Sequence, residues 1–371
     1  MKLNIAVLSG DGIGPEVTQQ ATKILDTIAE KYKHTFKYLK ADVGAIAIDK
    51  TGNPLPKETI EICNNADAIL FGAIGDPKYD KDPNAKVRPE QGLLALRKTL
   101  GLFANIRPLT TFNGLIHQSN LKEDVIKGTD FVIYRELTGG IYFGEKTLSD
   151  DGKTATDVCS YSIDEIDRIA HLAFKAAQKR RKKLTLVDKA NVLESSRLWR
   201  KRVTELSKQY SNVKLEYLFV DNAAMQLILN PTQFDVILTE NMFGDILSDE
   251  ASVIAGSIGL LASASVGEKT ALFEPIHGSY PQAKGKNIAN PVAAILSAAM
   301  LLEHFNLNDE AEDIRAAVDK SIELNISTPD LNLENHFSTA NVGSFIRDFI
   351  LDEDNTFYNK HNIDLGQSTI I

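Results

Sequence analysis

Two aspartates four residues apart are the clearest candidates for chemistry in this chain. Asp245 and Asp249 lie in the segment ENMFGDILSDE, residues 240–250, and on a helix that begins near Gly244 they share one face. Carboxylates on one face repel each other unless a cation lies between them, and oxygen-only ligands suit Mg²⁺ or Mn²⁺. A solvated acidic helix start is the alternative. Asp221 follows the strand-like segment 215–220 and is a natural third carboxylate, because ligands gather at the carboxyl ends of strands in α/β sheets.

Three arginines offer the opposite charge. Arg97 lies on the helix-like segment 93–100, Arg107 precedes a proline at an expected strand end, and Arg135 follows the apolar segment 131–134. Guanidinium groups at strand ends bind carboxylates in a bidentate manner, although a surface ion pair is the alternative for each one taken alone. Lys189, after Val187 and Asp188, and Tyr142, in the segment GGIYFG, complete a set that is able to move protons.

Two glycine-containing segments raise the question of a cofactor. The segment GDGIGPE, residues 10–16, follows the first strand, but the third glycine of a Rossmann fingerprint would fall at Pro15. We therefore interpret it as a strand–turn–helix junction and not as a Rossmann signature. The segment EPIHGSYP, residues 274–281, offers backbone amides and a hydroxyl to phosphate or ribose near His277. A purely structural loop histidine is the alternative there.

Short apolar runs alternate with segments of helical periodicity, which predicts an α/β protein with a substantial parallel component. The predicted strands are 3–8, 68–73, 131–134, 184–187, 215–220 and 236–239. The predicted helices are 17–32, 163–178, 195–210, 244–255 and 292–305. Residues 74–90, with three prolines, predict a loop or an extended segment.

Length, charge and cysteine content restrict the class of protein. A chain of 371 residues suits two domains. A net charge of −9 argues against nucleic acid or an anionic membrane as the main partner. The basic run 179–183 fits a helix C-terminus, with a nuclear-localisation signal as the alternative. Two distant cysteines, and the absence of a signal peptide or a long apolar run, lead us to expect a reducing, cytoplasmic location.

Taken in order, these segments resemble the β-hydroxyacid oxidative decarboxylases, the isocitrate and 3-isopropylmalate dehydrogenase family. The resemblance covers nearly the whole chain, at residues 10–16, 97, 105–108, 134–144, 187–200, 221–222, 241–260, 277–279 and 290–291. It implies an α/β fold of two domains around a large mixed sheet, not a Rossmann fold. A discontinuous cofactor-side domain would comprise residues 1–102 plus 256–371. Residues 103–255 would form the domain for substrate, metal and dimerisation.

The resemblance also implies a role for each candidate residue. Tyr142 would be the acid, and Lys189, from the partner subunit of a homodimer, would be the base. The substrate would contact Arg97, Arg107, Arg135, Asp221, Glu90, Leu93, Leu94 and Val192. A Mg²⁺ or Mn²⁺ ion would be bound by Asp245, Asp249 and the partner subunit's Asp221. The cofactor would contact Ile13, His277, Gly278, Ser279, Gln282 and Asn290.

The residues before Arg97 favour one substrate of this family. Where isocitrate enzymes resemble each other in a Ser and an Asn, Leu93 and Leu94 offer apolar surface, which favours an isopropyl group and penalises an unpaired carboxylate. We therefore expect oxidation and decarboxylation of 3-isopropylmalate to 4-methyl-2-oxopentanoate, a step of leucine biosynthesis. Isocitrate, D-malate, tartrate and homoisocitrate are alternative substrates, and both leucines could simply be helix core.

The expected hydride acceptor is NAD. NAD-dependent members of the family usually have an acidic residue after the proline of the adenosine-side loop, whereas this chain has Gln282. Gln282 and Ala283 supply no cation for a 2′-phosphate, although Lys284 is close in sequence. Two other classes stay open: a non-catalytic regulatory subunit of such an enzyme, and a metal-assisted hydrolase. The first would lack proton-transfer or metal residues, and the second would leave the three arginines without a purpose.

Overall fold

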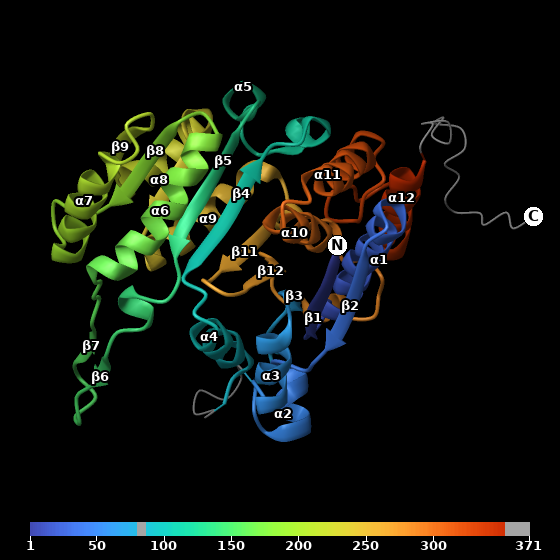
Figure 1. Ribbon diagram of the computed structural model, residues 1–371, viewed down its shortest axis with the longest axis horizontal. Helices are drawn as coiled ribbons and strands as arrows, with labels where there is room; N and C mark the ends of the chain where they lie inside the picture. Colours follow the sequence, from blue (N-terminus) through green and yellow to red (C-terminus); the bar gives the residue numbers. More distant parts are fainter. Residues whose placement is uncertain (80–86, 353–371) are drawn as a thin grey trace, which may run out of the picture.

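One large mixed sheet organises the protein (Figure 1). The computed structural model describes residues 1–79 and 87–352. The ten strands of the sheet lie in the order β2-β1-β3-β12-β11-β4-β5-β10-β8-β9. Their bounds are β1 Lys2–Gly10, β2 Thr35–Lys40, β3 Ala68–Ala73, β4 Ala104–Thr110, β5 Asp130–Glu136, β8 Lys183–Asp188, β9 Lys214–Phe219, β10 Val236–Thr239, β11 Ala262–Val266 and β12 Ala271–Pro275. A separate exposed hairpin consists of β6 Lys146–Leu148 and β7 Ala155–Asp157.

Helices connect the strands and cover the sheet. They are α1 Gly14–Tyr32, α2 Ala45–Thr51, α3 Lys57–Asn65, α4 Pro89–Thr99, α5 Glu123–Ile126, α6 Ile163–Lys179, α7 Glu194–Ser207, α8 Val220–Leu229, α9 Asn241–Ser252, α10 Val292–His304, α11 Asn308–Glu323 and α12 Thr339–Leu351. The predicted α/β class and large mixed sheet are confirmed. In the part of the chain that the structure describes, no helix is long and apolar enough to cross a membrane.

The middle of the sheet is antiparallel, whereas both wings are parallel. Strands β4 and β11 each run antiparallel to both of their neighbours, while β1–β3 and β5, β10, β8 and β9 pair in parallel. The register sets Asn105 opposite both Arg135 and Ser265. Since paired residues point to the same face, and side chains two apart on a strand do so too, Arg107 shares that face. The antiparallel centre therefore brings polar side chains from three strands together.

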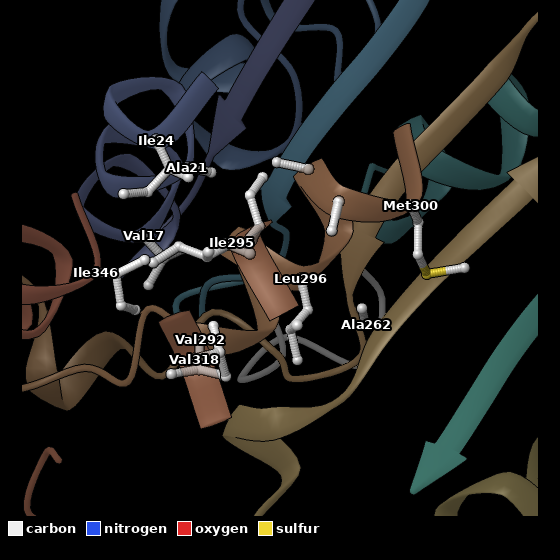
Figure 2. Close-up of a cluster of buried hydrophobic side chains, with 14 of the residues drawn as sticks. Val17, Ala21, Ile24, Ala262, Val292, Ile295, Leu296, Met300, Val318 and Ile346 are labelled. Carbon is white, nitrogen blue, oxygen red and sulfur yellow. The ribbon is translucent and has the colours of Figure 1, made fainter. Parts of the chain in front are cut away.

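The hydrophobic core divides along the chain. One large cluster joins the first strands to α1, α10, α11 and α12, and Figure 2 shows Val17 and Ile24 of α1 near Ile295 of α10. Helix α10 is buried on nearly every side, as is expected for a helix that is apolar all round. Two other clusters draw only on residues 103–254. The domain boundaries given above remain a proposal.

Three element boundaries differ from the expectation. Strand β4 continues through Arg107 to Thr110, so this arginine lies mid-strand and not at a strand end. Strand β9 ends at Phe219, which places Asp221 in the first turn of α8. Helix α9 begins at Asn241 and not near Gly244, because the Glu240 side chain accepts the backbone N–H of Phe243 and caps the helix there. In the expected loop 74–90, residues 80–86 lie outside the described residues.

Candidate active site

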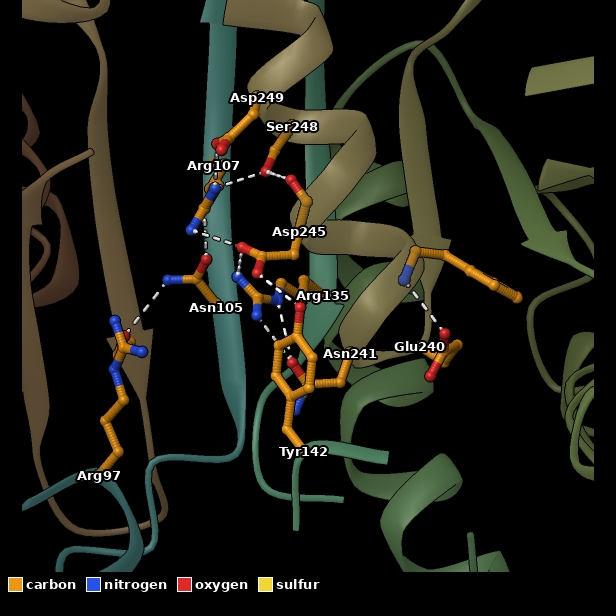
Figure 3. Close-up of polar contacts among 12 residues, drawn as sticks. Arg97, Asn105, Arg107, Arg135, Tyr142, Glu240, Asn241, Asp245, Ser248 and Asp249 are labelled. Atoms are coloured by element: carbon orange, nitrogen blue, oxygen red, sulfur yellow. Dashed lines mark hydrogen bonds and ion pairs between the residues drawn. The ribbon is translucent and has the colours of Figure 1, made fainter. Parts of the chain in front are cut away.

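Arg135 and Asp245 form the centre of a polar cluster between β4, β5 and α9 (Figure 3). The Arg135 Nη1 donates to Asp245 Oδ1 at 2.5 Å. Gly244 allows this approach, because a Cβ at that position would lie 2.6 Å from the Cγ of Arg135. The first turn of α9 therefore packs directly on the arginine stem and presents its carboxylate to the guanidinium group.

Arg107 extends the cluster to the second aspartate. Its Nε donates to Asn105 Oδ1 at 2.7 Å, and its Nη1 lies 3.3 Å from Asp249 Oδ1. Its Nη2 lies 3.8 Å from Asp245 Oδ1. One turn of α9 thus presents two carboxylates to two guanidinium groups, as Figure 3 shows, so the predicted gathering of opposite charges is present in one chain.

Arg97 approaches from α4 and pairs with Glu274, whose role no local sequence pattern indicates. Its Nη2 lies 2.8 Å from the buried carboxylate of Glu274 on β12. Ser265 donates to the same Glu274 oxygen at 3.3 Å and accepts from Asn105 Nδ2 at 3.2 Å. A continuous set of buried polar side chains therefore joins Arg97 to Arg107 through strands β12, β11 and β4.

Burial makes the positive charges of this site costly. The Arg135 side chain is only 4% exposed, and burial, with the nearby Arg107 charge, lowers its pKa to about 10 although Asp245 opposes the shift. Burial also lowers the pKa of Arg107, again against the carboxylates of Asp245 and Asp249. Two desolvated guanidinium groups side by side are stabilised by an added anion, so the site suits a carboxylated ligand.

Tyr142 completes the cluster from the short 3₁₀ turn η2, Gly140–Tyr142. Its hydroxyl donates to Asp245 Oδ2 at 2.9 Å, and the Arg135 guanidinium lies 5.8 Å from its ring centroid. Desolvation, followed by the hydrogen bond to Asp245, raises the pKa of Tyr142. The phenol is therefore protonated at neutral pH and lies at the carboxylates with a proton to give.

The acidic pair fits a divalent cation in part. The Asp245 and Asp249 side chains are 35% and 66% exposed, so both keep oxygen atoms open to a ligand, and oxygen donors match Mg²⁺ and Mn²⁺. Among residues 1–79 and 87–352, however, no three acidic, histidine or cysteine side chains lie close enough to hold a metal ion. One chain offers two carboxylates, and further oxygen donors have to come from a ligand, from water or from another chain.

Lys189 and Asp221 form a separate pair. The Lys189 Nζ lies 2.5 Å from Asp221 Oδ1, and this hydrogen bond lowers the pKa of Asp221. The neighbouring Val192 is 60% exposed. Within the described part of the chain, no hydrogen bond or ion pair joins this pair to Asp245, so the single chain does not bring the predicted base to the carboxylate cluster.

The predicted cofactor residues mostly line one pocket. A cavity of about 490 Å³ is bordered by Ile13, His277, Gly278 and Asn290. The Nε2 of His277 is buried without a hydrogen-bond partner among the described residues, and burial lowers the pKa of its imidazole. The pocket also contains Asp330, which accepts from Asn290 Nδ2 at 3.0 Å and which nothing in its own sequence context had indicated. A largely apolar pocket with an unpaired polar nitrogen fits the flat, polar-edged base of a nucleotide.

Ser279 and Gln282, the other two predicted cofactor residues, do not line this pocket. The carbonyl of Ser279 accepts the backbone N–H of Ile13 at 2.8 Å and joins the two predicted cofactor loops. Gln282 is exposed and does not border the pocket.

The residues expected at the substrate side chain lie on α4. The Glu90 carboxylate lies beside Gly75, where a Cβ would come within 2.9 Å of Glu90 Oε1. Leu93 is partly buried against a core cluster, and Leu94 is 44% exposed. Since Arg97 is one turn further along the same helix, Leu94 offers apolar surface near the guanidinium, while Leu93 also serves the core.

Comparison with known proteins adds independent information. Residues 4–346 match the family model described as isocitrate/isopropylmalate dehydrogenase. A 3-isopropylmalate dehydrogenase of Bacteroides fragilis is 57% identical over 352 residues, which cover 94% of this chain and 99% of that protein. That of Aquifex aeolicus is 53% identical over 337 residues, covering 90% and 92%. The crystal structure of isocitrate dehydrogenase from Methylococcus capsulatus superposes with a TM-score of 0.84 at 33% identity, covering 94% of this chain and 99% of that one.

Proposed function

The chain belongs to the isocitrate/isopropylmalate dehydrogenase family, and we propose that it oxidises and decarboxylates 3-isopropylmalate to 4-methyl-2-oxopentanoate, with NAD as the hydride acceptor, in leucine biosynthesis. The observation that carries this proposal is the convergence of Arg107, Arg135, Asp245, Asp249 and Tyr142 on one site. Relatives that carry the name 3-isopropylmalate dehydrogenase at more than 50% identity support the choice of substrate.

The arginines bind and orient the substrate. Arg107 and Arg135 hold one carboxylate between two guanidinium groups whose own charges are poorly solvated. Arg97 is held by Glu274 beside them and receives the second carboxylate. A dicarboxylate bound in this way is fixed at both ends, and such fixation lowers the entropic cost of reaching the transition state.

The acidic pair holds the divalent cation. Asp245 and Asp249, together with the partner subunit's Asp221, supply oxygen ligands, which explains why one chain alone lacks a complete set. When bound, the cation supplies Lewis acidity that lowers the pKa of the substrate hydroxyl and stabilises negative charge on the oxygen.

Two side chains move the protons. The partner subunit's Lys189 would take the proton of the C2 hydroxyl, and NAD, when bound, would accept the hydride from C2. The bond from C3 to its carboxylate then breaks and carbon dioxide leaves. The electron pair of the broken bond stays on the remaining 2-oxo acid and forms its enolate. Tyr142 donates the proton that converts this enolate to the 2-oxo acid. The hydrogen bond from Tyr142 to Asp245 keeps the phenol at the reacting end of the substrate.

Apolar surface on α4 discriminates between substrates of the family. Leu94, exposed one turn before Arg97, packs against the isopropyl group, with Val192 on the other side. Burying this group is worth about 2 kcal/mol. A third carboxylate, as in isocitrate, would lose solvation at the same place without a cation to pair with.

The pocket bordered by His277 and Asn290 would hold NAD. These two side chains would contact the adenine end, and Ile13 and Gly278 would pack on it. Among the residues that the structure describes, no lysine or arginine borders that pocket to receive a 2′-phosphate, and Lys284 lines a different cavity. This arrangement favours NAD over NADP, with weaker discrimination than an acidic residue at position 282 would give.

Exposed apolar side chains support a homodimer. They lie on the β6–β7 hairpin, where Leu148 is 67% exposed, and on the contacting helices α8 and α9, with Met225, Leu229 and Ile246 each more than half exposed. Apolar surface of this extent is typical of an interface. Ile246 adjoins Asp245, so a second copy on this surface reaches the site. We propose that the dimer acts in the cytoplasm.

A matrix of substrates and cofactors tests the proposal. Purified protein is assayed with 3-isopropylmalate, isocitrate, D-malate, tartrate and homoisocitrate, with NAD or NADP, and with or without Mn²⁺. We expect the highest kcat/KM with 3-isopropylmalate and NAD, and only when Mn²⁺ is present. A higher value with isocitrate would refute the argument from Leu94. Inactivity with every pair would instead favour a regulatory subunit, and product without reduced cofactor would favour a hydrolase.

A further inference from the structure

Asn241 connects two parts of the site, the Arg135 guanidinium and the backbone before the turn of Tyr142. It is completely buried in the first turn of α9. Its Oδ1 accepts from Arg135 Nη2 at 2.8 Å and from Arg135 Nε at 3.2 Å, and its Nδ2 donates to the carbonyl of Gly139 at 3.1 Å. Gly139 directly precedes the turn that carries Tyr142. One amide therefore contacts both the substrate-binding arginine, as Figure 3 shows, and the backbone leading to the proposed acid.

The backbone of Asn241 is itself held in place by hydrogen bonds. The backbone N–H of Asn241 donates to the Tyr161 hydroxyl at 3.0 Å, and that hydroxyl donates to Glu240 Oε2 at 3.0 Å. The ring of Tyr161 lies edge-on to Trp199, with centroids 5.4 Å apart. Since these contacts involve no ligand, Asn241 is oriented before the substrate arrives, as preorganised sites require.

The side chain at position 241 is neutral, and this has a consequence for Arg135. The guanidinium already has one anionic partner in Asp245 at 2.5 Å. An aspartate at position 241 would accept the same two hydrogen bonds, but it would add a second negative charge and remove the donor to Gly139. The amide orients the guanidinium through Nε and Nη2 and leaves its positive charge available to the substrate.

We propose that Asn241 is a positioning residue, which aligns Arg135 for the substrate carboxylate without neutralising it and links that alignment to the turn bearing Tyr142. This inference rests on the proposed function. Asn241 would thereby strengthen the preference of Arg135 for an anionic substrate. A guanidinium group that is not held in place loses part of its binding energy, because it has to be oriented when the substrate binds.

The test is a double-mutant cycle between positions 241 and 135. Asn241→Ala, Asn241→Asp, Arg135→Gln and the double variant Asn241→Ala/Arg135→Gln are compared in steady-state assays with NAD and Mn²⁺. Asn212→Ala is the matched control, because Asn212 is an exposed asparagine whose side chain accepts a hydrogen bond from Gln178. Circular dichroism and thermal unfolding establish that each variant is folded.

In the otherwise unchanged enzyme, Asn241→Ala is expected to raise the substrate KM on the order of tenfold and to lower kcat, while the KM for NAD stays within about twofold of the unmutated value. In the Arg135→Gln background it is expected to change the substrate KM by less than about threefold, because residues that act through one another are not additive. Asn241→Asp, which adds charge, is expected to raise the substrate KM further than Asn241→Ala does.

Equal effects of Asn241→Ala in both backgrounds would overturn the inference, as would a fall in kcat with both KM values unchanged, since a merely structural role reduces the active fraction alone. A substrate KM for Asn241→Asp equal to that of the unmutated enzyme would overturn the charge argument. Failure of the proposed function is distinguishable from all of these, because the unmutated protein would then show no activity with 3-isopropylmalate.

Discussion

Replacing Asp245 with asparagine keeps the shape of the side chain and removes one negative charge from beside two buried guanidinium groups. The lost charge lies 2.5 Å from Arg135 and 3.8 Å from Arg107. A hydrogen bond to a charged group is worth about 1.5–3 kcal/mol, and exposure of the Asp245 side chain to solvent, at 35%, reduces this value. We therefore expect Asp245→Asn to lower the unfolding free energy of the metal-free protein by about 1–2 kcal/mol.

Asp249→Asn is the matched comparison, because this side chain is 66% exposed and has one contact to Arg107 at 3.3 Å. Loss of the Asp249 charge is expected to lower the unfolding free energy of the metal-free protein by roughly 0–1 kcal/mol. Urea unfolding with and without Mn²⁺ measures both effects. At about 100 times its Kd, the metal is expected to stabilise the unmutated protein by roughly 2.7 kcal/mol and to stabilise neither variant by as much. Metal stabilisation of Asp245→Asn equal to that of the unmutated protein would refute the proposed ligand role.

Three further changes have definite expected outcomes. Tyr142→Phe should lower kcat by about 10²–10⁴-fold while the stabilisation by Mn²⁺ in urea unfolding is unchanged. Burial lowers the pKa of His277 below its ordinary value of 6.5. The neutral imidazole therefore stabilises the fold above that pH, and this contribution is lost as the pH falls toward the folded-state pKa. Between about pH 7 and pH 5, the unfolding free energy measured in urea should fall more in the unmutated protein than in His277→Gln. Mixing inactive Lys189→Ala and Asp245→Asn subunits should restore about a quarter of the activity, because half of the dimers are hybrids with one intact site.

Each of these outcomes has a clear opposite. An unchanged kcat in Tyr142→Phe would remove the phenol from proton transfer. Equal acid sensitivity of His277→Gln and the unmutated protein would show that the imidazole is not held in its neutral form. No recovery on mixing, under conditions in which the subunits exchange, would mean that each chain builds its site alone.

Apolar patterning predicted most of the buried strands because their sequences are continuous hydrophobic runs. The central strands were harder to predict. Strand β11 has the sequence ASASV and was not predicted, and β4 continues past its arginine and proline. Their polar side chains, among them Asn105 and Ser265, line the site and interrupt the hydrophobic pattern. Because the site needs these polar residues, the pattern does not predict the strands.

Residue types and spacing drew attention to charged groups that lie together in the fold, such as Arg135 and Asp245, but not to the residues that hold them. Asn241 and Arg135 are 106 positions apart, and Arg97 and Glu274 are 177 apart. Such pairs arise only when the sheet order brings distant strands together, and no local pattern encodes this order. The roles proposed for Lys189 and Asp221 would also depend on a second chain, whose position is a property of an assembly and not of the single fold.

The central claim is that the acidic pair and the arginines form one site for a metal ion and a dicarboxylate. Anomalous diffraction from a crystal grown with Mn²⁺ and 3-isopropylmalate tests it most directly. We predict one strong manganese peak within coordination distance of Asp245 and Asp249, with a substrate carboxylate between Arg107 and Arg135. A manganese peak elsewhere, or a substrate bound away from these guanidinium groups, would contradict the account.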